Sequence, residues 1–223
     1  MIGIIGAMDI ETKGIKSAMT DVCSETIASI EFIKGKISGK DVVCAMCNPG
    51  KVNAAICAQV MILTYNPDII INSGVAGSLI PQLKVLDVAI GTACVQHDFD
   101  LTALGSPKGM VDGVNKILFE CDEKGVELLN KICETENCVT GVIATGDQFI
   151  SGENIKNAIH NNFDAIACEM EGASIAHVCF VNNTRFAALR VISDGADEMD
   201  FNTFKVEASN KSVEIIKEFV NLY

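Results

Sequence analysis

The sequence contains no tryptophan, and aromatic residues make up only 5% of its 223 residues. An interior with so few rings is expected to consist mainly of Ile, Val, Ala and Met, and the 49% of residues that are hydrophobic supply a large core of that kind. Proline is also scarce, at four residues, and no Pro/Gly/Ser-rich linker divides the chain. We therefore expect one continuous domain over residues 1–223.

Positive charge is the second deficit. The 17 Lys and Arg residues are outnumbered by 29 Asp and Glu residues, which gives a formal net charge of −12. Such a surface repels the phosphate backbone of nucleic acids and anionic membrane surfaces, so we expect neither as a partner. The charge balance favours a neutral or cationic small molecule instead.

Long hydrophobic runs are missing as well. No apolar run approaches the ~18 residues of a transmembrane helix. The first residues, MIGIIGAMDIE, are apolar but have no basic segment before them and soon reach Asp9 and Glu11. This is not the pattern of a secretory signal peptide, and we expect a cytoplasmic protein.

The ten cysteines are spread along the chain, mostly within apolar runs, as small buried hydrophobic residues are. Cys44 and Cys47 form a CxxC pair, but no second pair follows at zinc-site spacing. Cys94 and His97 are likewise an isolated pair. We expect reduced thiols in an intracellular protein, with no metal site.

Short β-rich runs alternate with helical patterns, which predicts a mostly parallel or mixed sheet with helices on its faces. Strands are expected at residues 2–6, 68–72, 87–97, 139–145, 164–169 and 185–192. Residues 25–46 should form extended strands joined by turns at Gly35 and at Ser38–Gly39, and residues 73–78 should form a turn. Helices are expected around Ile15–Met19 and at 50–65, 124–135, 171–181 and 203–221, the second ending before Pro67.

Acidic residues follow four of the apolar strands: Glu11, Asp147, Glu171 and Asp194. In open α/β sheets, ligands bind beyond the carboxyl ends of the strands, so the four acids suggest one site. Each of them also has an ordinary alternative role, which is to cap the next helix. The acids alone leave both interpretations open.

The segment NSGVAG at 72–77 follows a strand and brings small residues to a possible ligand contact. It does not match GxGxxG, and no acidic residue stands about 20 residues further on, so a dinucleotide site is weakly supported. No Walker motif is present either. We expect no cofactor.

Six segments occur in an order that carries a resemblance across nearly the whole chain. They are IGIIGAMDIE at the start, NSGVAGSL at 72–79, HDFDLTALG at 97–105, ATGDQFISG at 144–152, CEMEGASIAHVC at 168–179 and RVISDGAD at 190–197. Together they resemble the methylthioadenosine/S-adenosylhomocysteine nucleosidases of the nucleoside phosphorylase superfamily. The resemblance implies a three-layer α/β/α sandwich with a central mixed sheet, a homodimer, and no metal or cofactor. It also implies hydrolysis of the bond between adenine and the ribose of a 5′-substituted adenosine.

The same resemblance implies roles for particular residues. Asp194 would be the general acid that protonates adenine N7, for which its pKa would have to be raised by burial or by neighbouring negative charge. Glu11 would orient and deprotonate the attacking water, and Glu171 would bind the ribose hydroxyls. Met8 and Met170 would pack against the sugar, Phe149 would stack on adenine, and the backbone of Ile150 would bind the adenine edge. Ser193 and Arg190 would support the acid and the water. The remaining candidate substrate-binding residues are Gly77, Glu169 and Phe201.

Some positions depart from the family pattern. Val75 stands where the family often has a serine, and Pro49 where a branched aliphatic residue is usual. Leu104 and Ser106 replace bulkier aromatic residues in the segment that normally reaches the partner's 5′-thio pocket. The stretch between Asp197 and Phe201 is about three residues short. These differences leave the 5′ group open among methylthio, homocysteinyl, 5′-deoxy and aminofutalosine-type substituents.

Two alternatives stay open beside hydrolysis. A phosphorolytic purine nucleoside phosphorylase would need charged clamps for phosphate, usually arginines, and this chain has few, among them Arg185 and Arg190. A nucleoside-binding protein without activity would be consistent with Val75 and the short segment after Asp197. The complete set of Glu11, Glu171 and Asp194 argues for an enzyme that activates water.

Overall fold

The computed structural model describes residues 1–195 and 198–223. Its strands are β1 (Ile2–Gly6), β2 (Thr20–Ile27), β3 (Ile30–Ile37), β4 (Lys40–Met46), β5 (Ile69–Ser78), β6 (Val88–Gln96), β7 (Leu118–Glu120), β8 (Cys138–Thr145), β9 (Ala165–Glu169) and β10 (Arg185–Asp194). Its helices are α1 (Asp9–Ala18), α2 (Lys51–Tyr65), α3 (Glu123–Ile132), α4 (Glu153–Phe163), α5 (Gly172–Val181) and α6 (Glu198–Leu222), with a 3-10 turn at Thr102–Leu104. Among the described residues, no helix is both long and apolar enough to cross a membrane.

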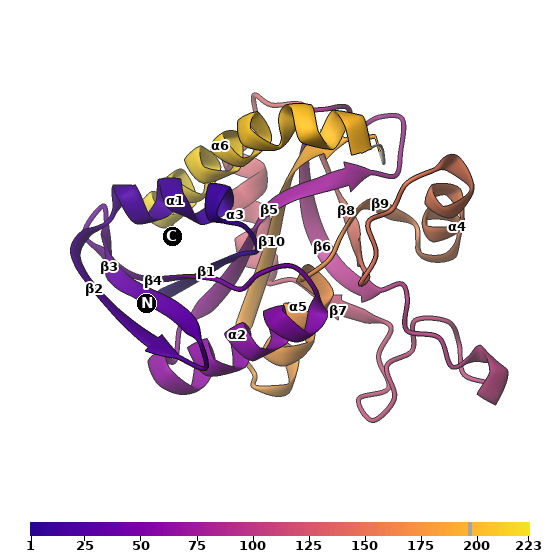
Figure 1. Ribbon diagram of the computed structural model, residues 1–223, viewed down its shortest axis with the longest axis horizontal. Coiled ribbons are helices and arrows are strands. Elements are labelled where there is room, and N and C mark those ends of the chain that lie inside the picture. Colours follow the sequence, from indigo (N-terminus) through magenta and orange to yellow (C-terminus); the bar gives the residue numbers. More distant parts are fainter. Residues whose placement is uncertain (196–197) are drawn as a thin grey trace.

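The strands form one mixed sheet in the order β10-β6-β8-β9-β5-β1-β4-β3-β2, with β7 paired to β6 (Figure 1). Strand β10 also pairs in parallel with β5, so β10, β6, β8, β9 and β5 close into a ring. The other strands continue the sheet from β5 through β1. The ring brings the ends of β5, β8, β9 and β10 together. In an open, flat sheet with the same strand order, three strands would separate β10 from β5.

Both faces of the sheet are covered, because successive residues of the central strands pack into opposite hydrophobic clusters. In β1, Ile5 packs on the side of α2 and α5, whereas Ile4 packs on the side of α1, α3 and α6. In β10, Ala188 and Leu189 divide in the same way. Figure 1 shows the two helical layers above and below the strands. The predicted three-layer sandwich with a mixed central sheet is confirmed.

The predicted turn at Gly35 is wrong. Gly35 lies inside β3 and pairs with Val42, and the chain reverses instead at Ala28 and Ser29, whose φ angles are 51° and 62°. A Cβ on Gly35 would lie 2.6 Å from the carbonyl oxygen of Thr20. The glycine therefore permits close approach of a neighbouring strand, which a sequence cannot distinguish from a turn.

The predicted turn at residues 73–78 is also wrong, because β5 runs on to Ser78. Gly74 pairs with Arg190 of β10, and a Cβ there would lie 2.5 Å from Oε1 of Glu11. The small residues admit a side chain against the strand rather than a bend in it. Helix α4 and the short strand β7 were not predicted; α4 buries Ile159 but is otherwise largely polar, so its apolar pattern is weak.

Candidate active site

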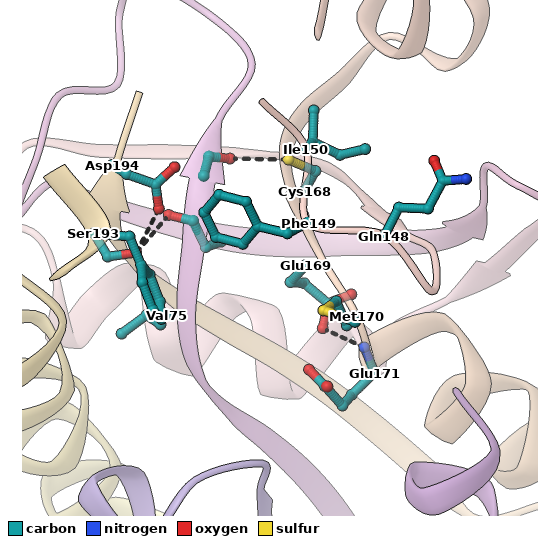
Figure 2. Close-up of a pocket in the computed structure, with 13 residues that line it drawn as sticks. Val75, Gln148, Phe149, Ile150, Cys168, Glu169, Met170, Glu171, Ser193 and Asp194 are labelled. Atoms are coloured by element: carbon teal, nitrogen blue, oxygen red, sulfur yellow. Dashed lines mark hydrogen bonds between the residues drawn. The ribbon is translucent and has the colours of Figure 1, made fainter. Parts of the chain in front are cut away.

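A cavity opens where the ends of β5, β9 and β10 meet the loop after β8. It is lined by Val75, Ala76, Gly77, Gln148, Phe149, Ile150, Cys168, Glu169, Met170, Glu171, Ser193, Asp194 and Phe201 (Figure 2). The structure thus brings together most of the residues that the sequence pointed to. Glu11, Met8 and Arg190 are not among the lining residues, although Glu11 and Arg190 bond residues that are, Val75 and Glu169.

Asp194 ends β10 in a row of three adjacent strands. It is opposite Gly77 of β5, which in turn is opposite Cys168 of β9. The register of β10 shifts between Ile192 and Asp194, as at a β-bulge. Such an irregularity lets Ser193 and Asp194 both face the cavity, where regular alternation would point them to opposite faces. Ser193 Oγ donates to Asp194 Oδ2 at 2.8 Å, and Asp194 is only 2% exposed.

Two aromatic rings are in contact in the lining of the cavity. The rings of Phe149 and Phe201 meet edge to face with centroids 5.5 Å apart. Figure 2 shows the ring of Phe149 extending toward Asp194 and Ser193, while the side chain of Gln148 points away from them. Phe149 is 48% exposed, so it has an apolar face available for a flat ligand.

Glu11 shows one of the two roles that the sequence left open, the capping of the next helix. Its Oε2 accepts the N–H groups of Ala7 and Met8, at 2.7 and 2.8 Å, and so caps the start of α1. Its Oε1 reaches across to β5 and accepts the N–H of Val75 at 3.1 Å. Burial raises the pKa of Glu11, although these N–H donors and the charge of Arg190 partly oppose the rise. The carboxyl is therefore held firmly next to the wall of the cavity.

The carboxylate of Glu169 is engaged by the protein itself. It forms a buried ion pair with Arg190 and accepts the N–H groups of Glu171 and Gly172 at the start of α5. Thr145 also donates its hydroxyl to Glu169 and accepts the N–H of Ala173. Arg190 is 1% exposed, bonds Asn72 as well, and does not reach the cavity. These two residues hold the strand ends and α5 in place.

Glu171 also lines the cavity, but its carboxylate bonds the start of α2 and not Arg190. Its Oε1 accepts the N–H of Gly50, before the first turn of α2, at 2.8 Å. Burial, with the nearby charge of Glu169, raises the pKa of Glu171 to about 8. The hydrogen bond from Gly50 and the charge of Arg190 act in the opposite direction. The cavity thus has a carboxyl group that changes charge close to neutral pH.

Comparisons with known proteins bear directly on this arrangement. The model of the phosphorylase superfamily matches residues 1–221. The 5′-methylthioadenosine/S-adenosylhomocysteine nucleosidase of Staphylococcus carnosus is 38% identical over 99% of both chains. The Neisseria meningitidis enzyme of that name, solved with methylthio-immucillin-A, has a TM-score of 0.96 at 33% identity and covers 100% of this chain and 99% of its own. The futalosine hydrolase of Helicobacter pylori has a TM-score of 0.95 at 34% identity, covering 100% and 97%.

The chain belongs to the 5′-methylthioadenosine/S-adenosylhomocysteine nucleosidases.

Against this family background, the sequence analysis missed several residues at the site. Gln148, Cys168 and Ala76 line the cavity, and Cys168 donates its thiol to the carbonyl oxygen of Gly77 at 3.7 Å. Asp147, the fourth predicted acid, is exposed and accepts the N–H of Lys51 at the start of α2. Its partner helix is distant in sequence, so no local pattern indicates this contact. Of the short segment that departs from the family, Asp197 lies outside the described residues, whereas Phe201 lines the cavity.

The raised pKa of Glu171 makes the free energy of unfolding depend on pH. Between the ordinary value of 4.5 and about 8, the folded protein keeps a proton that the unfolded chain has lost, so the free energy of unfolding falls as pH rises. Glu171→Gln removes that loss. We expect the variant to be more stable than the unaltered protein at pH 9, by on the order of 2 kcal/mol. Urea unfolding at pH 5 and pH 9 measures the difference, which should nearly vanish at pH 5; a difference independent of pH would contradict it.

Proposed function

We propose that the protein hydrolyses the N-glycosidic bond of 5′-methylthioadenosine, S-adenosylhomocysteine or a related 5′-substituted adenosine, releasing adenine. The observation that carries the proposal is the convergence of Asp194 and Glu171 on one cavity, with Glu11 bonded to Val75 in its lining. All three carboxyl groups are buried. Membership of the nucleosidase family supports the same reaction.

In the proposed reaction, adenine stacks on Phe149 and its edge is read by the backbone of Ile150. Asp194 donates a proton to adenine N7 while the bond between N9 and the sugar C1′ breaks and its electron pair moves into the base. The sugar then has oxocarbenium character, as in glycoside hydrolysis. Ser193 holds the carboxyl of Asp194 at 2.8 Å, which fixes the direction of proton transfer.

Glu11 is the group that we assign to the water. Three backbone N–H donors fix its two oxygens, and the pKa raised by burial suits a base that takes a proton from water near neutral pH. Water adds to C1′ and gives its proton to Glu11. Gly74 admits this carboxyl, since any larger residue there would place a Cβ 2.5 Å from Oε1.

The sugar is assigned to the other side of the cavity. Glu171 binds the ribose hydroxyls, and Met170 and Met8 pack against the ring. A carboxylate there also stabilises a cationic transition state. Gly77 and Phe201 complete the wall, whereas we assign Glu169 and Arg190 to holding the strands and α5, because their charged groups are paired with each other.

We prefer hydrolysis over phosphorolysis because the part of the cavity lining that the structure describes offers a phosphate no positive charge. Arg185 and Arg190 are the two arginines of the sequence. Arg190 is paired with Glu169, and Arg185 bonds the carbonyl of Asp68 at the opposite end of β10. Among the described residues that line the cavity, none is Lys or Arg. A phosphate dianion would find no clamp there.

We further propose a homodimer in the cytoplasm. On α2, Val52 and Leu63 are 70% and 75% exposed, and Leu104 is 81% exposed. Apolar side chains this exposed support a surface that a second copy covers. The ten cysteines are unpaired, most of them buried, which is consistent with a reducing compartment.

The test is to incubate the purified protein with methylthioadenosine in phosphate-free buffer and to follow adenine release. Adenine with free methylthioribose, at a rate unchanged by added phosphate, is the expected result. Release only with phosphate would make the protein a phosphorylase. Tight binding without release would make it a binding protein. Repeating the assay with S-adenosylhomocysteine, 5′-deoxyadenosine and aminofutalosine ranks the 5′ groups.

A further inference from the structure

The start of α2 joins the loop after β6 to the loop after β8, and residues of the second loop line the cavity. Lys51 Nζ lies 2.6 Å from Oδ1 of Asp98, in the loop after β6. The backbone N–H of Lys51 donates to Asp147 Oδ1 at 2.8 Å, and the N–H of Asp147 donates to Asp98 Oδ2 at 2.9 Å. These contacts form a closed circuit among α2 and the loops after β6 and β8.

The residue before Lys51 connects this circuit to the cavity. Gly50 has a φ of 102° and donates its N–H to Glu171 at 2.8 Å. Glycine adopts this φ without steric cost and can move away from it easily. The direction of the Gly50 N–H therefore depends on what holds the next residue. The neighbour, Lys51, is held by both its backbone and its ammonium group. The direction of the hydrogen bond to Glu171 is thus coupled to the Lys51 contacts.

The pair of Lys51 and Asp98 is well placed to supply this restraint. Their side chains are 18% and 19% exposed, so solvent screens them less than the surface pairs of the protein. Lys51 Nζ also lies 3.4 Å from Oε1 of Gln96. Lys51 does not line the cavity and so has no contact with a substrate there.

We propose that Lys51 is a positioning residue for the sugar-binding carboxylate: its ammonium group, anchored on Asp98, holds the start of α2 so that Gly50 donates to Glu171. The inference rests on the proposed function, because it takes Glu171 as the group that binds the ribose hydroxyls. It adds a residue of a remote helix to that role.

Loss of the Gly50 hydrogen bond has an electrostatic consequence. The charged and titratable groups that face Glu171 are Glu169 and Glu11, which raise its pKa, and Arg190, which lowers it. Cys47 also faces it, with a thiol whose own pKa is raised by burial. The N–H of Gly50 lowers the pKa of Glu171, so its withdrawal raises that pKa. A larger fraction of Glu171 is then protonated at neutral pH and accepts sugar hydroxyls less well.

The experiment compares Lys51→Met with Lys36→Met. Met keeps most of the length of Lys, and Lys36 makes a pair of similar length, 2.7 Å from Asp41, on the exposed side of β3 and β4. For Lys51→Met we expect KM for methylthioadenosine to rise about tenfold while kcat changes less than about threefold. In a plot of kcat/KM against pH, the fall on the acidic side (the acidic limb) should move to higher pH. Lys36→Met should change neither, and Lys51→Arg should restore most of the loss.

The outcomes separate the two proposals. Adenine release by the unaltered protein, with KM and the acidic limb unmoved in Lys51→Met, overturns this inference alone. No release by the unaltered protein overturns the proposed function and this inference with it. Where Lys51→Met does not fold, Asp98→Asn removes the same charge pair and must show the same rise in KM and the same pH shift.

Discussion

Asp194→Asn is expected to reduce adenine release at least about a thousandfold, with the fold and nucleoside binding retained. Asn has nearly the size and shape of Asp, so the buried position at the end of β10 is still filled. Its amide, however, has no proton acidic enough to give to adenine N7, and the base must then leave as an anion. Single-turnover measurements of adenine release give the chemical step directly.

Two measurements make this result specific. Calorimetry should show that Asp194→Asn binds methylthioadenosine with little change, because stacking on Phe149 and the sugar contacts of Glu171 remain. Ser193→Ala removes only the hydroxyl that holds Asp194 at 2.8 Å, and about a tenfold loss of rate is expected. A near-normal rate in Asp194→Asn would remove Asp194 from the mechanism and shift the acid role to another group.

The sequence predicted the fold well where local pattern determines structure. The aliphatic runs of β1, β6, β9 and β10 and the helix before Pro67 were placed within a few residues. The errors at Gly35 and Gly74 share one cause. Both glycines permit close approach of another segment, and the sequence signal for such an approach is the same as for a turn. Closure of the sheet through β5 and β10 is a long-range pairing that no local pattern contains.

The candidate site was predictable in its members but not in their division of labour. Motif order pointed to Asp194, Glu171 and Phe149, which do meet at the cavity. It grouped Glu169 with them, although the Glu169 carboxylate is turned to Arg190. Two acids separated by one residue look equivalent in a sequence. Which of them finds a buried cation depends on a strand 21 residues further along.

Arg190→Met is the substitution for which we expect the largest loss of stability, about 3–5 kcal/mol. The guanidinium is fully buried, and its removal leaves the Glu169 carboxylate charged in the interior without its cation. The carbonyl of Asn72 also loses a donor. Urea unfolding at pH 7 measures the loss. Arg185→Met is the matched control on the same strand: Arg185 is exposed, and the change should cost less than about 1 kcal/mol.

The same substitution separates structure from catalysis. In Arg190→Met/Glu169→Gln the uncompensated charge is gone, so part of the lost stability should return, which would mark the pair as coupled rather than additive. Activity should not return in parallel, because the Arg190 charge also lowers the pKa values of Glu11 and Glu171. Without it Glu11 holds its proton to higher pH in the double variant as well, so the acidic limb of kcat/KM should stay displaced. The pKa of Glu171, in contrast, falls back, because the charge of Glu169 that raises it is also gone. If Arg190→Met lowers the free energy of unfolding no more than Arg185→Met does, the buried pair does not hold the strand ends. If the acidic limb of kcat/KM does not move, the charge of Arg190 does not set the pKa values of these carboxyl groups.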